Sequence, residues 1–289
     1  MRICVTKTFL YDAIRQARPA DETVLGRQDC DVLVADPDVM TAGVLAAMPH
    51  VRTLISLSTG VDAVDHGYIQ AHGLRLINAA GVFAAPIAEY IVGAILMDAV
   101  GFPRLMAQQR RREYARYRQR HMVRDCTVGF LGTGSIATAA ARRLAALGCR
   151  IIGFKRHHVD ALAPYQQLLY PGQEPDFYGS CDYLVVATDL NDGSRGLVDK
   201  DKMHMMKPSA CLINIARGAV VVQDDLITAL QDGALRAAVL DVFSTEPLPA
   251  DSPLWSMDNV IVTPHTSGTY EYNHRDTIAY VLSALDRAG

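Results

Sequence analysis

The chain has 289 residues, of which 50% are hydrophobic and 20% charged, with a formal net charge of −3. This length suggests about two domains of ~100–200 residues each, with enough apolar residues for sizeable cores. The charge gives no electrostatic reason to expect nucleic acid or an anionic membrane as a partner. No run of ~20 apolar residues could span a bilayer, and the N-terminus lacks the long apolar core of a signal peptide.

The six cysteines are scattered, without a C-x-x-C pair or a histidine at metal-ligand spacing. Several lie beside apolar, strand-like runs, where a reduced thiol behaves as a small hydrophobic side chain. We therefore expect no metal site and no disulfide framework. Reduced cysteines are typical of the cytoplasm, which is the expected location.

The first 95 residues alternate between strand-like and helix-like segments, which favours a parallel, doubly wound sheet. The expected strands are residues 2–6, 31–35, 53–57 and 74–77, with a connecting helix at 41–48. The third strand leads into Ser58, Thr59 and Gly60. Ligands in such sheets bind beyond the carboxyl ends of strands, so these amides are candidates for holding an anion. A capped strand-to-helix turn is the alternative.

Residues 86–100 are apolar on nearly every side of a helix, which predicts a buried helix. Glu89 lies on it, and a hydrogen bond at a helix end or between domains is favoured over a catalytic role. Residues 103–124 follow with eight arginines and two tyrosines. A nucleic-acid patch would fit this composition, but no other basic surface accompanies it. We expect a solvated connecting arm, or an arm that packs on a partner subunit.

A glycine turn lies between two expected strands, at residues 127–131 and 150–154. Gly132, Gly134 and Ala137 form a G-x-G-x-x-A pattern at the start of a helical segment. The first glycine permits a tight bend, and the second lets a pyrophosphate approach the amides at the helix N-terminus. The flanking strands and helix make this otherwise weak pattern specific for a dinucleotide. The expected contacts are Gly132, Gly134, Ser135 and Ile136.

The end of the second strand of this unit bears on the choice of cofactor. An NAD-specific site usually has an acidic residue there, ~20 residues beyond the glycines, to bind the ribose hydroxyls. This chain has Lys155, Arg156 and His157 instead, with no acid before Asp160. These cations would attract the 2′-phosphate of NADP, unless they only face solvent. We predict NADP, with NAD as the alternative.

The remaining sequence continues the alternation. Residues 159–179 are rich in Pro, Gly, Gln and Tyr and predict a long irregular crossover. Further strands are expected at residues 182–187, 210–215, 235–240 and 259–262, and helices at 224–232 and 270–287.

Polar clusters follow three of these later strands, with Arg217 in the first, Glu246 in the second and His265 in the third. An arginine fork can hold a carboxylate through two parallel hydrogen bonds. Histidine exchanges protons near neutral pH, and a glutamate bonded to its ring would stabilise the imidazolium. Each residue alone has an ordinary explanation, as a surface ion pair, a turn cap or a loop histidine. Together they predict an anion clamp beside a proton donor.

These motifs resemble those of the D-isomer-specific 2-hydroxyacid dehydrogenases, which include glyoxylate/hydroxypyruvate reductases, phosphoglycerate dehydrogenases and D-lactate dehydrogenases. The resemblance covers nearly the whole chain and rests on LSTGVD, the buried Ala88-Glu89 helix, LINIARG, DVFSTEPLP and TPHTSG in that order. It implies an α/β fold of two doubly wound parallel-sheet domains. A Rossmann dinucleotide-binding domain, residues 96–269, would be inserted into a flavodoxin-like substrate domain, residues 1–95 and 270–289. It further implies a cleft between the domains and a homodimer held through the arm and the cofactor domain.

The resemblance also implies residue roles. Arg217, Glu246 and His265 fall on the catalytic positions, and Ser58 to Gly60 fall on the loop that binds the substrate carboxylate. Asp241 would lie near the nicotinamide, with Thr188 and Ala216 as further cofactor contacts. Residues 188–191 depart from the family, which often has a proline-containing loop there. The departure would change the ribose contacts, or nothing.

The expected function is an NADP-linked reductase that interconverts a small 2-keto acid, such as glyoxylate or hydroxypyruvate, and its D-2-hydroxy acid. One alternative is an NAD-linked dehydrogenase of another, for instance phosphorylated, 2-hydroxy acid. A substrate phosphate would need an extra basic residue near Ser58 to Gly60, which the local sequence lacks, and no regulatory domain follows Gly289 as in the larger phosphoglycerate dehydrogenases. A non-catalytic dinucleotide sensor is a third possibility, against which the presence of Arg217, Glu246 and His265 together argues.

Overall fold

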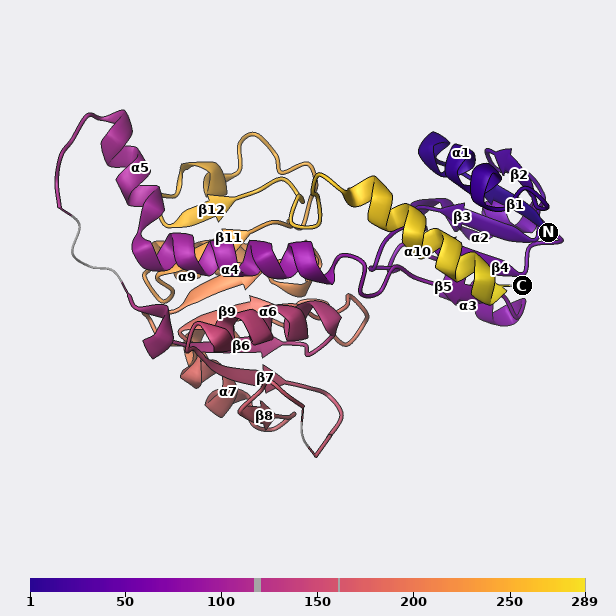
Figure 1. Ribbon diagram of the computed structural model, residues 1–289. Coiled ribbons are helices and arrows are strands. Elements are labelled where there is room, and N and C mark those ends of the chain that lie inside the picture. Colours follow the sequence, from indigo (N-terminus) through magenta and orange to yellow (C-terminus); the bar gives the residue numbers. More distant parts are fainter. Residues whose placement is uncertain (117–120, 161, 289) are drawn as a thin grey trace. The chain divides into compact units, whose positions relative to one another are not determined.

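The computed structural model describes residues 1–116, 121–160 and 162–288 (Figure 1). They form two compact units, Met1–Phe83 with Thr269–Gly289, and Ala84–Gly268. The chain leaves the first unit, builds the second and returns with its last helix. Each unit contains a parallel sheet with helices on both faces, which confirms the predicted fold class.

The first unit is built on a five-stranded sheet in the order β2-β1-β3-β4-β5, in which every pairing is parallel. This is the strand order of flavodoxin-like folds. The strands are β1 (Arg2–Val5), β2 (Glu22–Leu25), β3 (Val32–Ala35), β4 (Thr53–Ser56) and β5 (Arg75–Ile77). The helices are α1 (Thr8–Ala17), α2 (Ala42–Ala46), α3 (His66–Ala71) and α10 (Asn273–Ala288), with a 3-10 turn, η1, at Pro37–Val39.

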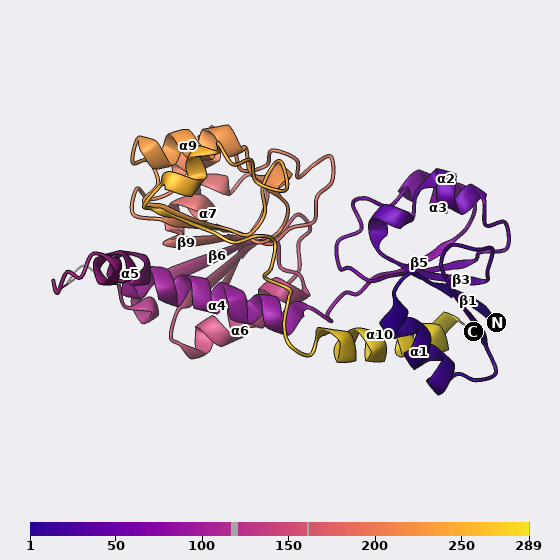
Figure 2. The ribbon, with the colours of Figure 1, turned by 90° about the horizontal axis from the view of Figure 1, so that it is seen from above.

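Successive side chains along these strands enter two different cores, because they point to opposite faces of the sheet. Ile3 and Val5 pack with residues of α1 and α10 on one face. Cys4 packs with Leu45 of α2 and Ile69 of α3 on the other. Figure 2 shows the two pairs of helices on opposite sides of the sheet.

The second unit is built on a seven-stranded parallel sheet in the order β12-β11-β10-β9-β6-β7-β8. The strands are β6 (Thr127–Leu131), β7 (Arg150–Phe154), β8 (Gln167–Leu169), β9 (Tyr183–Val186), β10 (Cys211–Asn214), β11 (Ala237–Leu240) and β12 (Val260–Val262). The helices are α4 (Ala84–Val100), α5 (Phe102–Arg110), α6 (Ser135–Ala146), α7 (Glu174–Ser180), α8 (Lys200–Met205) and α9 (Gln223–Gln231). Three 3-10 turns complete it: η2 (Val123–Asp125), η3 (Gly218–Val220) and η4 (Pro253–Ser256).

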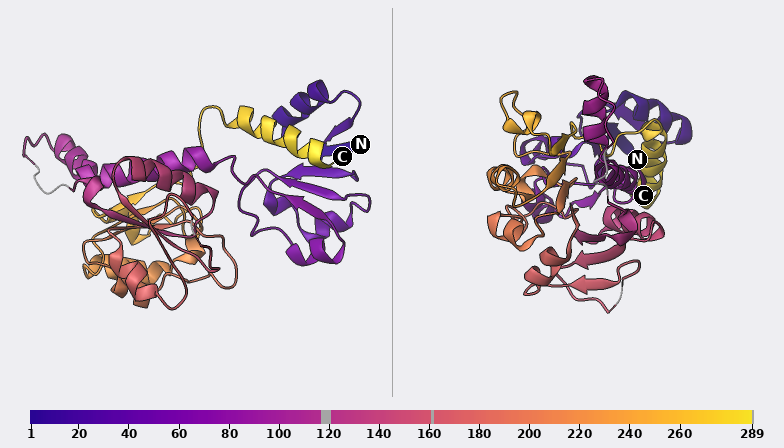
Figure 3. Two further views of the ribbon diagram at one scale, coloured as in Figure 1. Left: turned by 60° about the horizontal axis from the view of Figure 1, so that its bottom comes forward. Right: turned by 90° about the vertical axis from the view of Figure 1, so that its left-hand side faces the viewer.

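Helices α4 and α6 cover one face of this sheet, and α7 to α9 cover the other (Figures 2 and 3). From β6 the chain builds outward through β7 to β8, and it then returns to place β9 on the other side of β6. The strand order therefore reverses at β6. In such sheets a ligand binds beyond the carboxyl ends of the strands at this switch point.

Helix α4 begins two residues before the predicted helix, packs on α6 and buries Ile87, Ile91 and Ile95. It therefore belongs to the second unit, so the boundary lies after Phe83 and not after residue 95. Its predicted burial on all sides is wrong, because Leu96 and Met97 are 36% and 38% exposed.

Other differences fall where the local pattern is weak. The expected irregular crossover contains β8, a three-residue edge strand, and α7, whose first turn includes a proline. Helix α5 forms the first part of the expected arm, and residues 117–120 of that arm lie outside the described residues. Within the described ranges no single helix is long and apolar enough to cross a membrane. Only α4 and α5 taken together, with a 64° bend between them, reach that length and hydropathy.

Candidate active site

The glycine turn between β6 and α6 has the geometry that dinucleotide binding requires. Gly132 has a φ of 95°, and a Cβ on it would lie 2.6 Å from the carbonyl oxygen of Ala187, so no other residue fits. Gly134 is the N-cap of α6, and a Cβ there would meet no atom within 4 Å. Ala137 is fully buried beneath the turn. The α6 N-terminus, without a side-chain cap, is thus left to bind an anion.

The predicted basic residues lie where β7 ends. Arg156 is exposed and directs Nη2 towards Oδ1 of Asn191, 3.4 Å away in the loop after β9. A Cβ on Gly193 in that loop would lie 3.0 Å from the same nitrogen. His157 is exposed beside it, and Lys155 is partly exposed. The loops that follow β7 and β9, the strands on either side of β6, therefore meet around an arginine.

Arg217 lies at the end of β10, at the N-cap of the turn η3. Its Nη1 donates to the carbonyl of Ala216 at 2.8 Å, and Nδ2 of Asn214 donates to the Arg217 carbonyl at 3.1 Å. Gly218 follows, where a Cβ would lie 1.9 Å from the carbonyl group of Phe243. This segment is therefore packed directly against the backbone that follows β11.

His265 and Glu246 form an ion pair, with Nδ1 of the ring 2.7 Å from Oε2 of the carboxylate. The other carboxylate oxygen, Oε1, accepts the backbone N–H of Phe243 at 2.9 Å. The side chains are 50% and 36% exposed. Since an ionised carboxylate only accepts hydrogen bonds, Nδ1 carries a proton and Nε2 is the ring nitrogen left for chemistry.

Asp241, at the end of β11, is fully buried and holds the loop that carries His265. Its Oδ1 accepts the Thr263 hydroxyl at 2.6 Å and the Thr266 N–H at 2.9 Å, and its Oδ2 accepts the Ser267 N–H at 2.9 Å. Its carbonyl accepts the His265 N–H at 2.8 Å. The contacts of this carboxylate are those of a residue that shapes the loop.

Sequence reasoning missed several residues of this network. Thr263 and Tyr90, whose hydroxyls lie 2.6 Å apart, are separated by 173 residues, so no local pattern links them. The sequence could have pointed to Asn214, because a polar residue at the end of an apolar, buried strand needs hydrogen-bond partners.

The loop after β4 belongs to the first unit. The Ser58 N–H bonds to Oγ of Ser56 at 3.2 Å, and the Thr59 hydroxyl bonds to the carbonyl of Ala79 at 3.2 Å. The Thr59 and Gly60 amides have no hydrogen-bond acceptor among the described residues. The loop is thus ordered by internal bonds that engage the amide of Ser58 and leave the next two amides available.

All the predicted site residues of the second unit lie beyond carboxyl ends of its strands. The segments containing Arg217, Glu246 and His265 follow β10, β11 and β12, which are adjacent in the sheet. The glycine turn, the basic residues and Thr188 follow β6, β7 and β9. Among the residues that the structure describes, no group of three or more His, Cys, Asp or Glu side chains could hold a metal ion.

Residues 92–267 match the model of the family described as D-isomer specific 2-hydroxyacid dehydrogenase, NAD binding domain. The chain belongs to this family. Membership supports an NAD(P)-dependent oxidoreductase, as the sequence predicts.

Named 2-hydroxyacid dehydrogenases resemble the chain over most of its length. It is 30% identical to a human glyoxylate reductase/hydroxypyruvate reductase over 82% of this chain and 74% of that protein. It is 29% identical to a Methanocaldococcus jannaschii D-3-phosphoglycerate dehydrogenase over 94% of this chain but only 54% of that longer protein. The fold is similar, with a TM-score of 0.87 and 26% identity, to that of a Xanthobacter autotrophicus family member in complex with NADPH and MES. That likeness covers 99% of this chain and 94% of the other.

Proposed function

We propose that this 2-hydroxyacid dehydrogenase is an NADP-linked reductase of a small 2-keto acid, of the glyoxylate/hydroxypyruvate type, and forms the D-2-hydroxy acid. The observation that carries the proposal is the 2.7 Å contact between His265 Nδ1 and Glu246 Oε2, at a strand end adjacent to the one that presents Arg217. It supplies a proton donor oriented by a carboxylate, next to a group that binds carboxylates.

The residues around the glycine turn fit a dinucleotide. A side chain at Gly132 would collide with the backbone of Ala187, whereas the space around Gly134 is open. The helix that follows the turn begins without a side-chain cap. Such a turn offers backbone amides to a pyrophosphate. When bound there, the reduced nicotinamide supplies the hydride for the keto carbon.

The protein's own residues would then manage charge and protons. Arg217 binds the substrate carboxylate, with its fork held by the bond to the Ala216 carbonyl. In the first unit, the Thr59 and Gly60 amides are proposed to bind a carboxylate, as the sequence predicts for that loop. His265, protonated on both nitrogens, gives the Nε2 proton to the alkoxide as it forms. The Nδ1 proton stays on the ring and is hydrogen-bonded to Glu246. In the oxidative direction the neutral Nε2 accepts the hydroxyl proton.

NADP is favoured by the residues at the end of β7. Arg156 is exposed there, Lys155 and His157 lie beside it, and no acidic residue comes before Asp160. A 2′-phosphate would pair with this cationic edge, whereas an NAD-specific site has a carboxylate at this position. The NADPH in the Xanthobacter structure is consistent with this choice.

A homodimer is part of the proposal. Six exposed large apolar side chains gather on the C-terminal part of α4, on α5 and on the arm: Leu96, Met97, Phe102, Met106, Tyr114 and Met122. Several large apolar side chains exposed along one segment favour an interaction site there, and we assign it to a second copy of the chain. Light scattering should give the mass of a dimer, and Met106→Glu should shift it towards the monomer.

The six free, buried cysteines fit a reducing cytoplasm.

The test is steady-state oxidation of NADPH and NADH with a panel of 2-keto acids, including glyoxylate, hydroxypyruvate, pyruvate and 3-phosphohydroxypyruvate. Turnover of the small, unphosphorylated acids with NADPH preferred is expected. Preference for NADH and the phosphorylated acid would favour the alternative dehydrogenase. Tight NADPH binding without any turnover would favour a dinucleotide sensor. His204, exposed on α8, provides a control, because His204→Ala should retain turnover while His265→Ala should not.

A further inference from the structure

The backbone at His265 has an unusual conformation. Its φ is 49°, in the left-handed region that residues other than glycine rarely adopt. In the described chain it shares this property only with Arg112. Such a conformation persists only where the surroundings determine it, so the contacts of residues 263–267 decide where the imidazole points.

Those contacts lead from Asp241 to helix α4. Oγ1 of Thr263 lies 2.6 Å from Oδ1 of Asp241 and 2.6 Å from the hydroxyl of Tyr90 on α4. An ionised carboxylate only accepts, so the Thr263 hydroxyl donates its single proton to Asp241. The Tyr90 hydroxyl must then be the donor to Thr263. Burial raises the pKa of Tyr90 to about 12, so this donor keeps its proton at neutral pH.

We infer that Tyr90 is a positioning residue for His265, which acts through Thr263 and Asp241 and touches neither substrate nor cofactor. The Tyr90 hydroxyl fixes the Thr263 hydroxyl, and this bond orients the Asp241 carboxylate that binds the Thr266 and Ser267 amides. The loop on both sides of His265 is thereby tied to α4. This role rests on the proposed function of His265 as proton donor.

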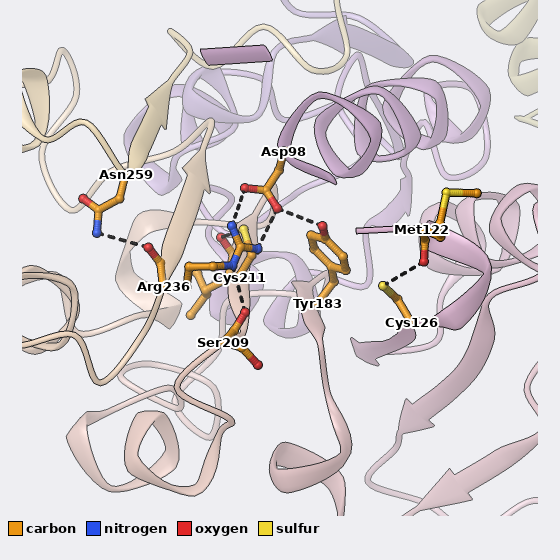
Figure 4. A network of polar contacts seen from close by, with 9 residues as sticks. Asp98, Met122, Cys126, Tyr183, Ser209, Cys211, Arg236 and Asn259 are labelled. Carbon is orange, nitrogen blue, oxygen red and sulfur yellow. Dashed lines mark hydrogen bonds and ion pairs between the residues drawn. The ribbon is translucent and has the colours of Figure 1, made fainter. Parts of the chain in front are cut away.

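A matched control lies at the other end of α4. The Tyr183 hydroxyl donates to Oδ2 of Asp98 at 2.8 Å, and Arg236 holds the same carboxylate through two nitrogens at 2.8 and 2.6 Å (Figure 4). Tyr183 begins β9, so it lies at the amino edge of the sheet, opposite the edge that carries His265. Tyr183→Phe thus removes a buried hydroxyl that bonds to the same helix, without touching the loop.

The experiment compares Tyr90→Phe with Tyr183→Phe by two readouts. The first is kcat for 2-keto acid reduction, with the Kd for NADPH measured alongside as the reference for cofactor binding. The second is amide hydrogen exchange of Thr263 and residues 265–268, which needs no turnover. Loss of one net hydrogen bond predicts, for Tyr90→Phe, a kcat roughly 2- to 12-fold lower and exchange faster by a similar factor. NADPH affinity should stay within about twofold, and both readouts should be unchanged in Tyr183→Phe.

Thr263 provides an independent test if Tyr90→Phe fails to fold. Thr263→Val should reproduce the loss and Thr263→Ser should restore it, because serine keeps the hydroxyl. Equal behaviour of the two tyrosine variants in both readouts would overturn the inference, as would a loss confined to NADPH affinity. If the wild-type protein reduces no 2-keto acid, the proposed function fails, and the exchange measurement still decides whether Tyr90 orders the loop.

Discussion

Gly134→Ala separates cofactor binding from folding. Gly134 has a φ of −73° and a ψ of −170°, which any residue can adopt, and an added Cβ would meet no atom within 4 Å. Loss of unfolded-chain entropy should stabilise the variant by ~0.4–1 kcal/mol. Alanine is a poorer N-cap than glycine by a similar amount. The two effects oppose each other, so the free energy of unfolding should change by less than about 0.5 kcal/mol.

Binding of the dinucleotide should respond quite differently. The Cβ would point into the space through which a pyrophosphate reaches the amides at the start of α6. Overpacking of this kind costs ~1–3 kcal/mol, which weakens the Kd for NADPH by roughly 5- to 150-fold. Urea unfolding without ligand and fluorescence titration with NADPH measure the two quantities separately.

Two further glycines serve as comparisons. Gly132→Ala places a Cβ 2.6 Å from the Ala187 carbonyl at a φ of 95°, so it should lower the free energy of unfolding by roughly 2–5 kcal/mol. Gly43→Ala, in the exposed part of α2, should leave NADPH affinity unchanged. Wild-type NADPH affinity in Gly134→Ala would refute the assignment of this turn to the pyrophosphate. A large loss of stability in the same variant would refute the statement that an added Cβ at Gly134 has free space around it.

The remaining predictions concern charge and protons. Arg156→Glu should raise the KM for NADPH at least about 10-fold through repulsion of the 2′-phosphate without raising that for NADH, whereas Arg150→Glu, at the amino end of the same strand, should change neither. His265→Ala should lower kcat by ~10²–10⁴-fold, and Glu246→Gln should lower it less, while both keep NADPH affinity by titration. Tyr90 should also affect alkaline unfolding, because burial raises its pKa to about 12. The stability contributed by the protonated hydroxyl is full below the unfolded value of ~10 and is lost as the pH rises towards 12, by up to ~1.4 kcal/mol per pH unit. Urea titrations between pH 9 and 12 should therefore show a shallower decline for Tyr90→Phe, and an identical slope would contradict the assignment.

The parts of the fold that the sequence predicted best are those in which several local signals agree. Strands β6 and β7 have the predicted bounds, because apolar runs flank a glycine turn and a helix that is followed by Gly148. Strand β8 has only three residues at a sheet edge, and α7 contains both Pro175 and Gly179, so neither carries a clear periodicity. The exposed apolar residues of α4 were also unforeseen, since composition shows that a helix is apolar but not which neighbours cover it.

The same distinction applies to the site. Arg217, Glu246 and His265 were identifiable as residue types beyond strand ends. The structure adds the contact between Glu246 and His265 and the close packing of Gly218 on Phe243. The role of the Asp241 carboxylate was not predictable, because it depends on how β11 and β12 pair and on where the following loop turns back.

The order of the three late motifs follows from the sheet. Strands β10, β11 and β12 are adjacent and parallel, so each return of the chain brings one more segment to the same carboxyl edge. The arginine comes from the first of these segments, and the glutamate from the second meets the histidine from the third. Backbone packing fixes the first two segments on each other, since Gly218 leaves no space for a side chain against Phe243. The third segment is held by hydrogen bonds to Asp241. This explains why the hydroxyls of Thr263 and Tyr90 matter for the position of the residue that is proposed to move the proton.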